Sequence, residues 1–246
     1  MPSVTAPGLV VEGLALHFGG SVVFEDLSFR IEGGRCVALL GASGIGKSSL
    51  LRILAGLLAP SAGTVRLSDG GAPRGRIAYM AQQDLLYPWL TALDNVTLGA
   101  RLRRQQPDTA RALHLLERVG LAGRARALPA ELSGGMRQRV ALARTLYEDR
   151  PVVLMDEPFS ALDAITRARM QEQAAALLAG RTVLLITHDP LEACRLGHHL
   201  LVMSGQPARL GPPIAVPGNA PRPPDDPEVL RLQGQLLRLL SAGEAE

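Results

Sequence analysis

The sequence has little cysteine, little net charge and no long hydrophobic run. Its 246 residues contain only Cys36 and Cys194 as cysteines, which argues against a disulfide framework and indicates small core residues. No apolar run approaches the length of a membrane span, and the N-terminus lacks a basic start followed by an apolar stretch. We therefore expect a soluble, cytoplasmic chain that needs a separate partner for any role at a membrane.

The charges of the chain are nearly balanced. The net charge of +3 comes from scattered basic residues, so no nucleic-acid partner is expected. His17, His114, His198 and His199 show no metal-ligand spacing with cysteines or carboxylates. Apolar residues make up 47% of the chain, which is enough for one large α/β domain or for one domain with an inserted lobe.

Residues 41–48 match G-x-x-x-x-G-K-S, the pattern of a phosphate-binding loop. An apolar run at 36–40 predicts the preceding strand, and the pattern at 49–57 predicts the following helix. Lys47 should reach the β- and γ-phosphates, and the Ser48 hydroxyl should ligate Mg²⁺. The alternative, a glycine-rich turn that binds nothing, is disfavoured by the flanking strand and helix. The predicted nucleotide contacts in and next to this loop are Gly41, Ala42, Ser43, Gly44, Ile45, Gly46, Lys47, Ser48 and Ser49.

Two carboxylates follow a second apolar run, residues 152–155. At the carboxyl end of a parallel strand, Asp156 and Glu157 would lie beside the phosphate loop. Asp156 is suited to the Mg²⁺ shell, and Glu157 could polarise the attacking water as a general base. Taken alone, an acidic pair after a strand also fits a solvated turn.

A third motif precedes the helix expected at 136–147. Ser133, Gly134 and Gly135 would offer an anion a hydroxyl, backbone N–H groups and the helix dipole, although an ordinary capped helix has the same pattern. A helical region separates this motif from the phosphate loop. The simplest geometry places the two devices on opposite subunits of a head-to-tail homodimer, with the nucleotide between them.

Periodicity places these motifs on a β/α framework. The expected strands cover 9–18, 24–31, 64–67, 76–80, 152–155 and 182–187. The expected helices cover 91–104, 107–119, 136–147, 164–178 and 226–240. The helices at 91–147 therefore interrupt a strand-rich domain.

Together, the phosphate loop, Leu132–Gln138 and the Met-Asp-Glu-Pro run at 155–158 resemble the ATP-binding subunits of ABC transporters. The resemblance covers nearly the whole chain. It implies an α/β fold, a P-loop NTPase of ABC type with a RecA-like core, an N-terminal antiparallel β part and an inserted α-helical subdomain. Residues 1–246 would form one domain, with about 1–84 and 151–204 as the core with its β part, about 85–150 as the helical subdomain and 205–246 as C-terminal loops and a helix.

The resemblance also assigns roles to single residues. Gln82 looks like the glutamine that senses Mg²⁺ and the γ-phosphate, and His188 looks like the switch histidine that contacts the γ-phosphate. Residues 160–163 look like the D-loop, which adds Asp163 to the ATP contacts. Phe18 lies where the family stacks an aromatic ring on adenine, although without the family it would be read as a core residue. The implied catalytic residues are Lys47, Gln82, Glu157 and His188, and the implied Mg²⁺ ligands are Ser48, Gln82 and Asp156.

Residues 80–96 resemble, more narrowly, the nitrate/sulfonate/taurine importer group. Within this stretch, Met-Ala-Gln-Gln-Asp and Pro-Trp-Leu are similar to predicted importers of hydroxymethylpyrimidine or thiamine precursors. In the family this region faces the membrane permease, so Tyr87 and Trp89 are candidate contacts. Burial of Trp89 inside the helical lobe is an equal alternative.

The expected function is ATP hydrolysis that powers import of a small solute. The chain would be peripheral on the inner face of the cell membrane, bound to a permease near Gln82–Val96 and served indirectly by a periplasmic or extracellular solute-binding protein. An exporter or lipid-extraction ATPase, a soluble non-transport ABC ATPase and a non-catalytic nucleotide-binding scaffold are the alternatives.

Overall fold

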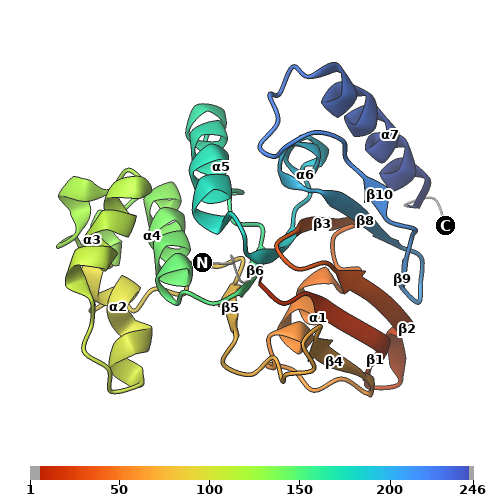
Figure 1. Ribbon diagram of the computed structural model, residues 1–246, viewed down its shortest axis with the longest axis horizontal. Coiled ribbons are helices and arrows are strands. Elements are labelled where there is room, and N and C mark those ends of the chain that lie inside the picture. The colour runs from red at the N-terminus through yellow and green to blue at the C-terminus, as the bar shows by residue number, and fades with distance from the viewer. Residues whose placement is uncertain (1–5, 244–246) are drawn as a thin grey trace.

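The computed structural model describes residues 6–243, so residues 1–5 and 244–246 of the expected single domain lie outside the described part. Two sheets form its centre (Figure 1). The smaller sheet is antiparallel, in the order β2-β1-β4. Its strands are β1 (Leu9–Phe18), β2 (Ser21–Ile31) and β4 (Ala62–Leu67).

The larger sheet has seven strands in the order β10-β8-β3-β7-β6-β5, with β9 paired to β8. Neighbours from β8 to β5 run parallel, as the βα alternation of the sequence predicts. Its strands are β3 (Cys36–Gly41), β5 (Ile77–Met80), β6 (Val152–Asp156), β7 (Thr182–Ile186), β8 (His199–Ser204), β9 (Arg209–Leu210) and β10 (Ile214–Ala215).

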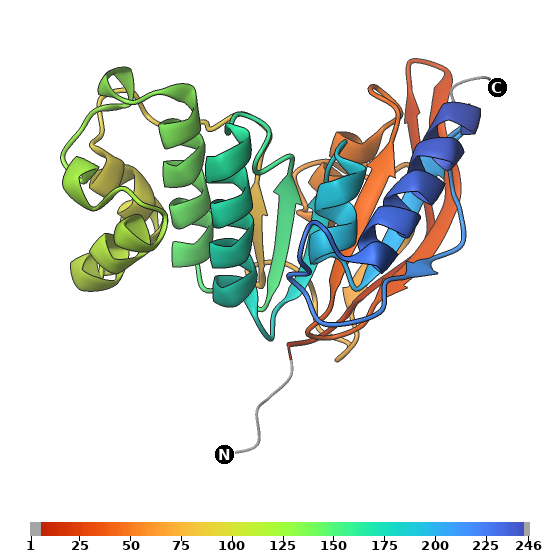
Figure 2. The same cartoon turned by 90° about the horizontal axis from the view of Figure 1, so that it is seen from above.

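Both faces of the large sheet are buried, which explains its almost uninterrupted apolar strands. On β3, Leu39 belongs to a cluster that joins the antiparallel sheet and α1 (Lys47–Leu54). The next residue, Leu40, points to the opposite face and packs with α6 (Pro190–Leu196) and α7 (Pro227–Gly243). Figure 2 shows the two helices lying on that face. The sandwich fixes the carboxyl ends of the strands, from which the loops of the site project.

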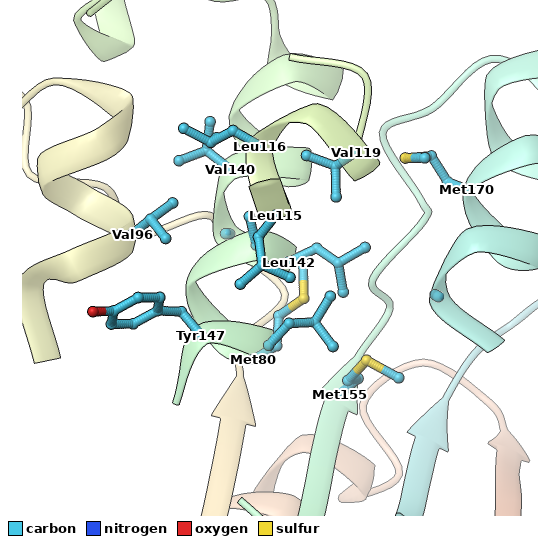
Figure 3. Packing of buried hydrophobic residues seen from close by; sticks show 14 of the residues in the cluster. Met80, Val96, Leu115, Leu116, Val119, Val140, Leu142, Tyr147, Met155 and Met170 are labelled. Atoms are coloured by element: carbon cyan, nitrogen blue, oxygen red, sulfur yellow. The ribbon is translucent and has the colours of Figure 1, made fainter. Parts of the chain in front are cut away.

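Three helices form a lobe beside this core: α2 (Ala92–Leu102), α3 (Thr109–Arg118) and α4 (Gly134–Tyr147). Val96, Leu115 and Val140 meet in its centre, and the same cluster continues to Met155 on β6 (Figure 3). The fifth helix, α5 (Ala164–Leu178), lies beside α4 in both views (Figures 1 and 2). The apolar contacts therefore tie the lobe to the carboxyl end of β6.

Side-chain caps set the helix starts that the sequence predicts. Thr91, Asp108, Ser133 and Asp163 each accept a backbone N–H at the start of α2, α3, α4 and α5, respectively. The helix after the phosphate loop is shorter than its apolar pattern indicates. It ends at Leu54, and Gly56 adopts φ 72°, a left-handed conformation that glycine allows at a helix end.

No helix within residues 6–243 is both long and apolar enough to cross a membrane.

Candidate nucleotide site

The phosphate loop joins the carboxyl end of β3 to the N-terminus of α1. Its shape depends on glycine at two positions. A Cβ on Gly41 would lie 2.4 Å from the Met203 carbonyl oxygen, and one on Gly46, at φ 109°, would lie 2.7 Å from Val23. The loop therefore lies tightly between β2 and β8 and leads directly into the helix N-terminus, where negative charge is favoured.

Lys47 is buried inside this loop, with 7% of its surface exposed. Its ammonium group donates hydrogen bonds of 2.7 Å to the carbonyl oxygens of Gly41 and Ala42. Burial lowers the pKa of Lys47, and the nearby carboxylates of Glu157 and Asp156 oppose that shift. The loop thus holds a desolvated cation at its centre, where an entering phosphate would meet it.

A cavity of about 460 Å³ opens over the loop. Most of the predicted catalytic and metal-binding residues meet here, although they come from distant segments of the chain. Its lining consists of Gly41, Ser43, Gly44, Gly46, Lys47, Ser48, Ser49, Gln82, Asp156, Glu157 and His188.

Asp156 ends β6 and is 3% exposed. Burial raises the pKa of its carboxyl group, while a hydrogen bond with the Ser48 side chain lowers it. A hydroxyl and a carboxylate at hydrogen-bond distance, next to a phosphate loop, are the oxygen donors that Mg²⁺ prefers. The residues therefore fit Mg²⁺ with a bound nucleotide, although residues 6–243 contain no group of three or more His, Cys, Asp or Glu side chains that could hold a metal ion by themselves.

Glu157 adopts φ 48°, a left-handed conformation that is costly for a residue with a side chain. Its N–H donates to the carbonyl oxygen of Ile186 at 2.9 Å. The Gln82 amide donates to Glu157 Oε2 at 3.2 Å, and Nδ1 of His188 lies 3.2 Å from the same oxygen. Two predicted catalytic residues, Gln82 and His188, therefore converge on one carboxylate oxygen of a third, Glu157.

The Ser133 motif lies outside this cavity. Gly134 lines a neighbouring hollow of about 400 Å³, which Gln82 also lines. Ser133 caps α4 by accepting from the Met136 N–H at 3.3 Å. Lys47 and Gly134 thus line different cavities of the chain.

Other predicted contacts lie at the surface. Phe18 is 52% exposed at the end of β1. It is therefore not the core residue that the sequence pattern favours when the family resemblance is left aside. Asp163 caps α5 by accepting from the Thr166 N–H at 3.0 Å and does not line the cavity. Trp89 is 70% exposed and packs edge-on against Tyr87, with ring centroids 5.4 Å apart. Of the two alternatives for Trp89, burial inside the helical lobe is therefore wrong, and the side chain is available at the surface.

Gln138 also contacts this site, a role the motif alone does not reveal. Its buried side-chain amide bonds with the segment that follows β6, including the carbonyl oxygen of Glu157. The sequence signal is its place one turn inside α4, on the side that faces the core.

Comparison with known proteins decides the family. The ABC transporter family matches residues 24–160. The chain belongs to the ABC transporter family. An aliphatic sulfonates import ATP-binding protein, SsuB 1, from Rhodococcus jostii is 45% identical over 100% of this chain and 98% of its own length. A taurine import ATP-binding protein, TauB, from Jannaschia is 41% identical over 82% of this chain and 80% of its own length. An uncharacterized ABC transporter ATP-binding protein from Haemophilus influenzae is 44% identical over 94% of the chain.

Solved ABC structures share the fold. The ATP-binding cassette MJ0796, in a dimeric post-hydrolysis state bound to ADP and Pi, superposes with a TM-score of 0.77 at 29% identity, covering 86% of this chain and 100% of that one. A second dimeric structure of MJ0796 gives a TM-score of 0.76. The ABC resemblance and the α/β P-loop fold expected from the sequence are therefore confirmed.

Four residues after His188 in this ABC protein lies a buried acid. Glu192, on α6, is 4% exposed and accepts from the Gln171 amide at 3.0 Å. Burial is the main cause that raises the pKa of Glu192 to about 7, and the negative charge of Asp189 raises it further. Hydrogen bonds with Thr187 and Gln171 and the positive charge of Arg167 lower the pKa and partly offset this rise. Because its folded-state pKa exceeds the ordinary value, the contribution of Glu192 to stability is fully present below about pH 4.5 and is lost as the pH rises through about 7.

Glu192→Gln is expected to remove this pH dependence. From pH 5 to pH 8, the free energy of unfolding should decrease in the wild type more than in the variant, and the two decreases should differ by up to about 3 kcal/mol. Urea unfolding at the two pH values measures the difference. Equal pH dependence in both proteins would contradict the prediction.

Proposed function

We propose that this chain is the ATP-hydrolysing subunit of a membrane importer for small sulfonates, either aliphatic sulfonates or taurine. The observation that carries the proposal is identity of 41–45% to import ATP-binding subunits for these solutes, over most of the chain. Their names favour sulfonates over the hydroxymethylpyrimidine or thiamine-precursor alternative. The phosphate loop meets Gln82, Asp156, Glu157 and His188 in one cavity, which supports the enzymatic part of the proposal.

Two copies would form the active unit. Lys47 and Gly134 line different cavities within one chain, and a head-to-tail homodimer would place Ser133, Gly134 and Gly135 of one subunit over the phosphate loop of the other. Both MJ0796 structures are dimeric, which supports the same assembly here.

Within each site the chain's own groups divide the work. Lys47 and the loop N–H groups bind the phosphates, and Phe18 offers an exposed ring to adenine. Mg²⁺, which Ser48, Gln82 and Asp156 would hold, supplies neutralisation of phosphate charge. Oε2 of Glu157 accepts a proton from the attacking water. Gln82 and His188 both contact Oε2 of that carboxylate and would face the γ-phosphate.

The permease would dock beside the helical lobe. The Gln82–Val96 segment exposes three large apolar side chains shortly after Gln82, namely Leu85, Tyr87 and Trp89. Docking there would hold the chain at the inner face of the cell membrane. When the γ-phosphate is lost, a change in the position of Gln82 would be transmitted along this segment to the permease. An external solute-binding protein would deliver the solute to the permease.

Trp89→Ala is expected to weaken co-purification with the co-expressed permease by about 30-fold or more in affinity, because a central aromatic anchor is lost. ATP affinity of the isolated chain should not change. Leu102→Ala, at a position of the lobe that is 72% exposed, is the matched control and should bind the permease normally. Unchanged binding by the Trp89 variant would contradict the docking site.

Reconstitution tests the whole proposal. Vesicles that contain the chain, its permease and its solute-binding protein should take up taurine or an alkanesulfonate only when ATP is present on the side of this subunit. For an importer, the solute must leave the compartment that holds the solute-binding protein and enter the compartment that holds this subunit. The opposite direction would support the exporter alternative, and stimulation of the ATPase by RNA without any transport would support a soluble ABC ATPase.

A further inference from the structure

Gln138 joins the helical lobe to the turn that carries Glu157. It lies on α4 and is 4% exposed. Its Nε2 donates to the carbonyl oxygen of Glu157 at 2.9 Å and to Ser160 Oγ at 3.3 Å, and its Oε1 accepts from the Ala161 N–H at 2.9 Å. All these bonds end in the turn at residues 157–161, between β6 and α5.

The turn packs closely on α4. A Cβ on Gly135 would lie 3.1 Å from the carbonyl oxygen of Ala161 and 3.0 Å from Leu162 Cδ2, so the first turn of α4 contacts it almost backbone to backbone. The left-handed φ of Glu157 persists only if its surroundings hold it. The amide of Gln138 supplies such support at the carbonyl oxygen of Glu157 itself.

The carboxylate of Glu157 is held by Gln82 and His188, which lie outside α4. The backbone of the same residue is held by α4, whose N-terminus carries Ser133. A shift of α4 toward or away from a nucleotide would therefore move the Glu157 turn as well. Such coupling matters because misplacement by about 1 Å can cost about a hundredfold in rate.

We propose that Gln138 is a positioning residue for ATP hydrolysis, which fixes the Glu157 turn to the N-terminal half of α4. The proposal rests on the role of Glu157 as the general base. Gln138 does not line the cavity over the phosphate loop and acts through Glu157 and Ser160. Its loss should therefore reduce the rate of hydrolysis and leave nucleotide binding unchanged.

Gln138→Met keeps the length of the side chain and removes its hydrogen bonds. We expect kcat to fall by about a hundredfold, with unchanged Kd and stoichiometry of ATP binding. Thr145→Val is the control, because it removes a buried hydrogen bond that stays inside the same helix, to the carbonyl oxygen of Ala141, and does not reach the turn. It should keep the wild-type kcat, and thermal unfolding of both variants measures any loss of stability.

Ser160→Ala changes an exposed residue and removes the bonds its hydroxyl makes with Gln138 and Glu157. Its kcat should lie between those of the wild type and Gln138→Met. A wild-type kcat in Gln138→Met, or a loss of binding stoichiometry in proportion to kcat, would overturn the proposal. If Gln138→Met does not fold, a wild-type kcat in Ser160→Ala overturns it. Hydrolysis by Glu157→Gln at the wild-type rate in the same assay would instead overturn the role of Glu157.

Discussion

Glu157→Gln is expected to slow ATP hydrolysis by about a thousandfold, the middle of the range for loss of a general base. The amide keeps the size of the side chain but cannot accept a proton from water. Oε1 of the glutamine can still accept from the Gln82 amide, so the cavity should keep its shape. ATP binding should persist, and single-turnover kinetics with labelled ATP measure the chemical step separately from binding.

The same variant should accumulate an ATP-bound dimer, because nucleotide that is not hydrolysed keeps holding both subunits. Light scattering with and without ATP measures this. Glu117→Gln, at an exposed glutamate of α3, is the control. It should show the wild-type rate of ATP hydrolysis and the wild-type fraction of dimer, both with and without ATP. Wild-type hydrolysis by the Glu157 variant would show that another group activates the water.

The sequence could predict the parts of the site that depend on local backbone geometry. The loop at Gly41–Ser48 needs glycines and a strand–helix junction, and the structure shows both. Asp156 and Glu157 follow an apolar strand, and a parallel sheet places the ends of such strands beside one another. The helix starts at Ser133 and Asp163 were predictable for the same reason, because a cap acts on the next few residues.

The remaining features depend on contacts between distant segments. The exposure of Trp89 depends on how the loop before α2 leaves β5, and an aromatic residue among leucines fits either outcome. Gln138 has the periodicity of an ordinary helical residue, and only the approach of the 157–161 turn gives its amide a role. The apolar pattern after Ser48 continues past Leu54, but Gly56 allows the chain to turn away.

Lys47→Ala is expected to weaken ATP binding by about 2 kcal/mol, or roughly 30-fold, because a charge-assisted contact to phosphate is lost. The buried ammonium group is desolvated before the nucleotide arrives, and its hydrogen bonds to Gly41 and Ala42 keep it aimed into the loop. Isothermal titration with a non-hydrolysable ATP analogue measures the change. Arg66→Ala removes a surface charge paired with Glu12 and should bind the analogue normally.

Lys47 is the only lysine in the sequence, which gives an independent test of the same contact. An amine-reactive reagent can then modify only this side chain and the N-terminal amine, and mass spectrometry separates the two products. Bound ATP should protect Lys47 but not the N-terminus, because only Lys47 would lie against phosphate. Equal modification of Lys47 with and without saturating ATP, together with normal binding by Lys47→Ala, would show that the phosphates do not lie in this loop.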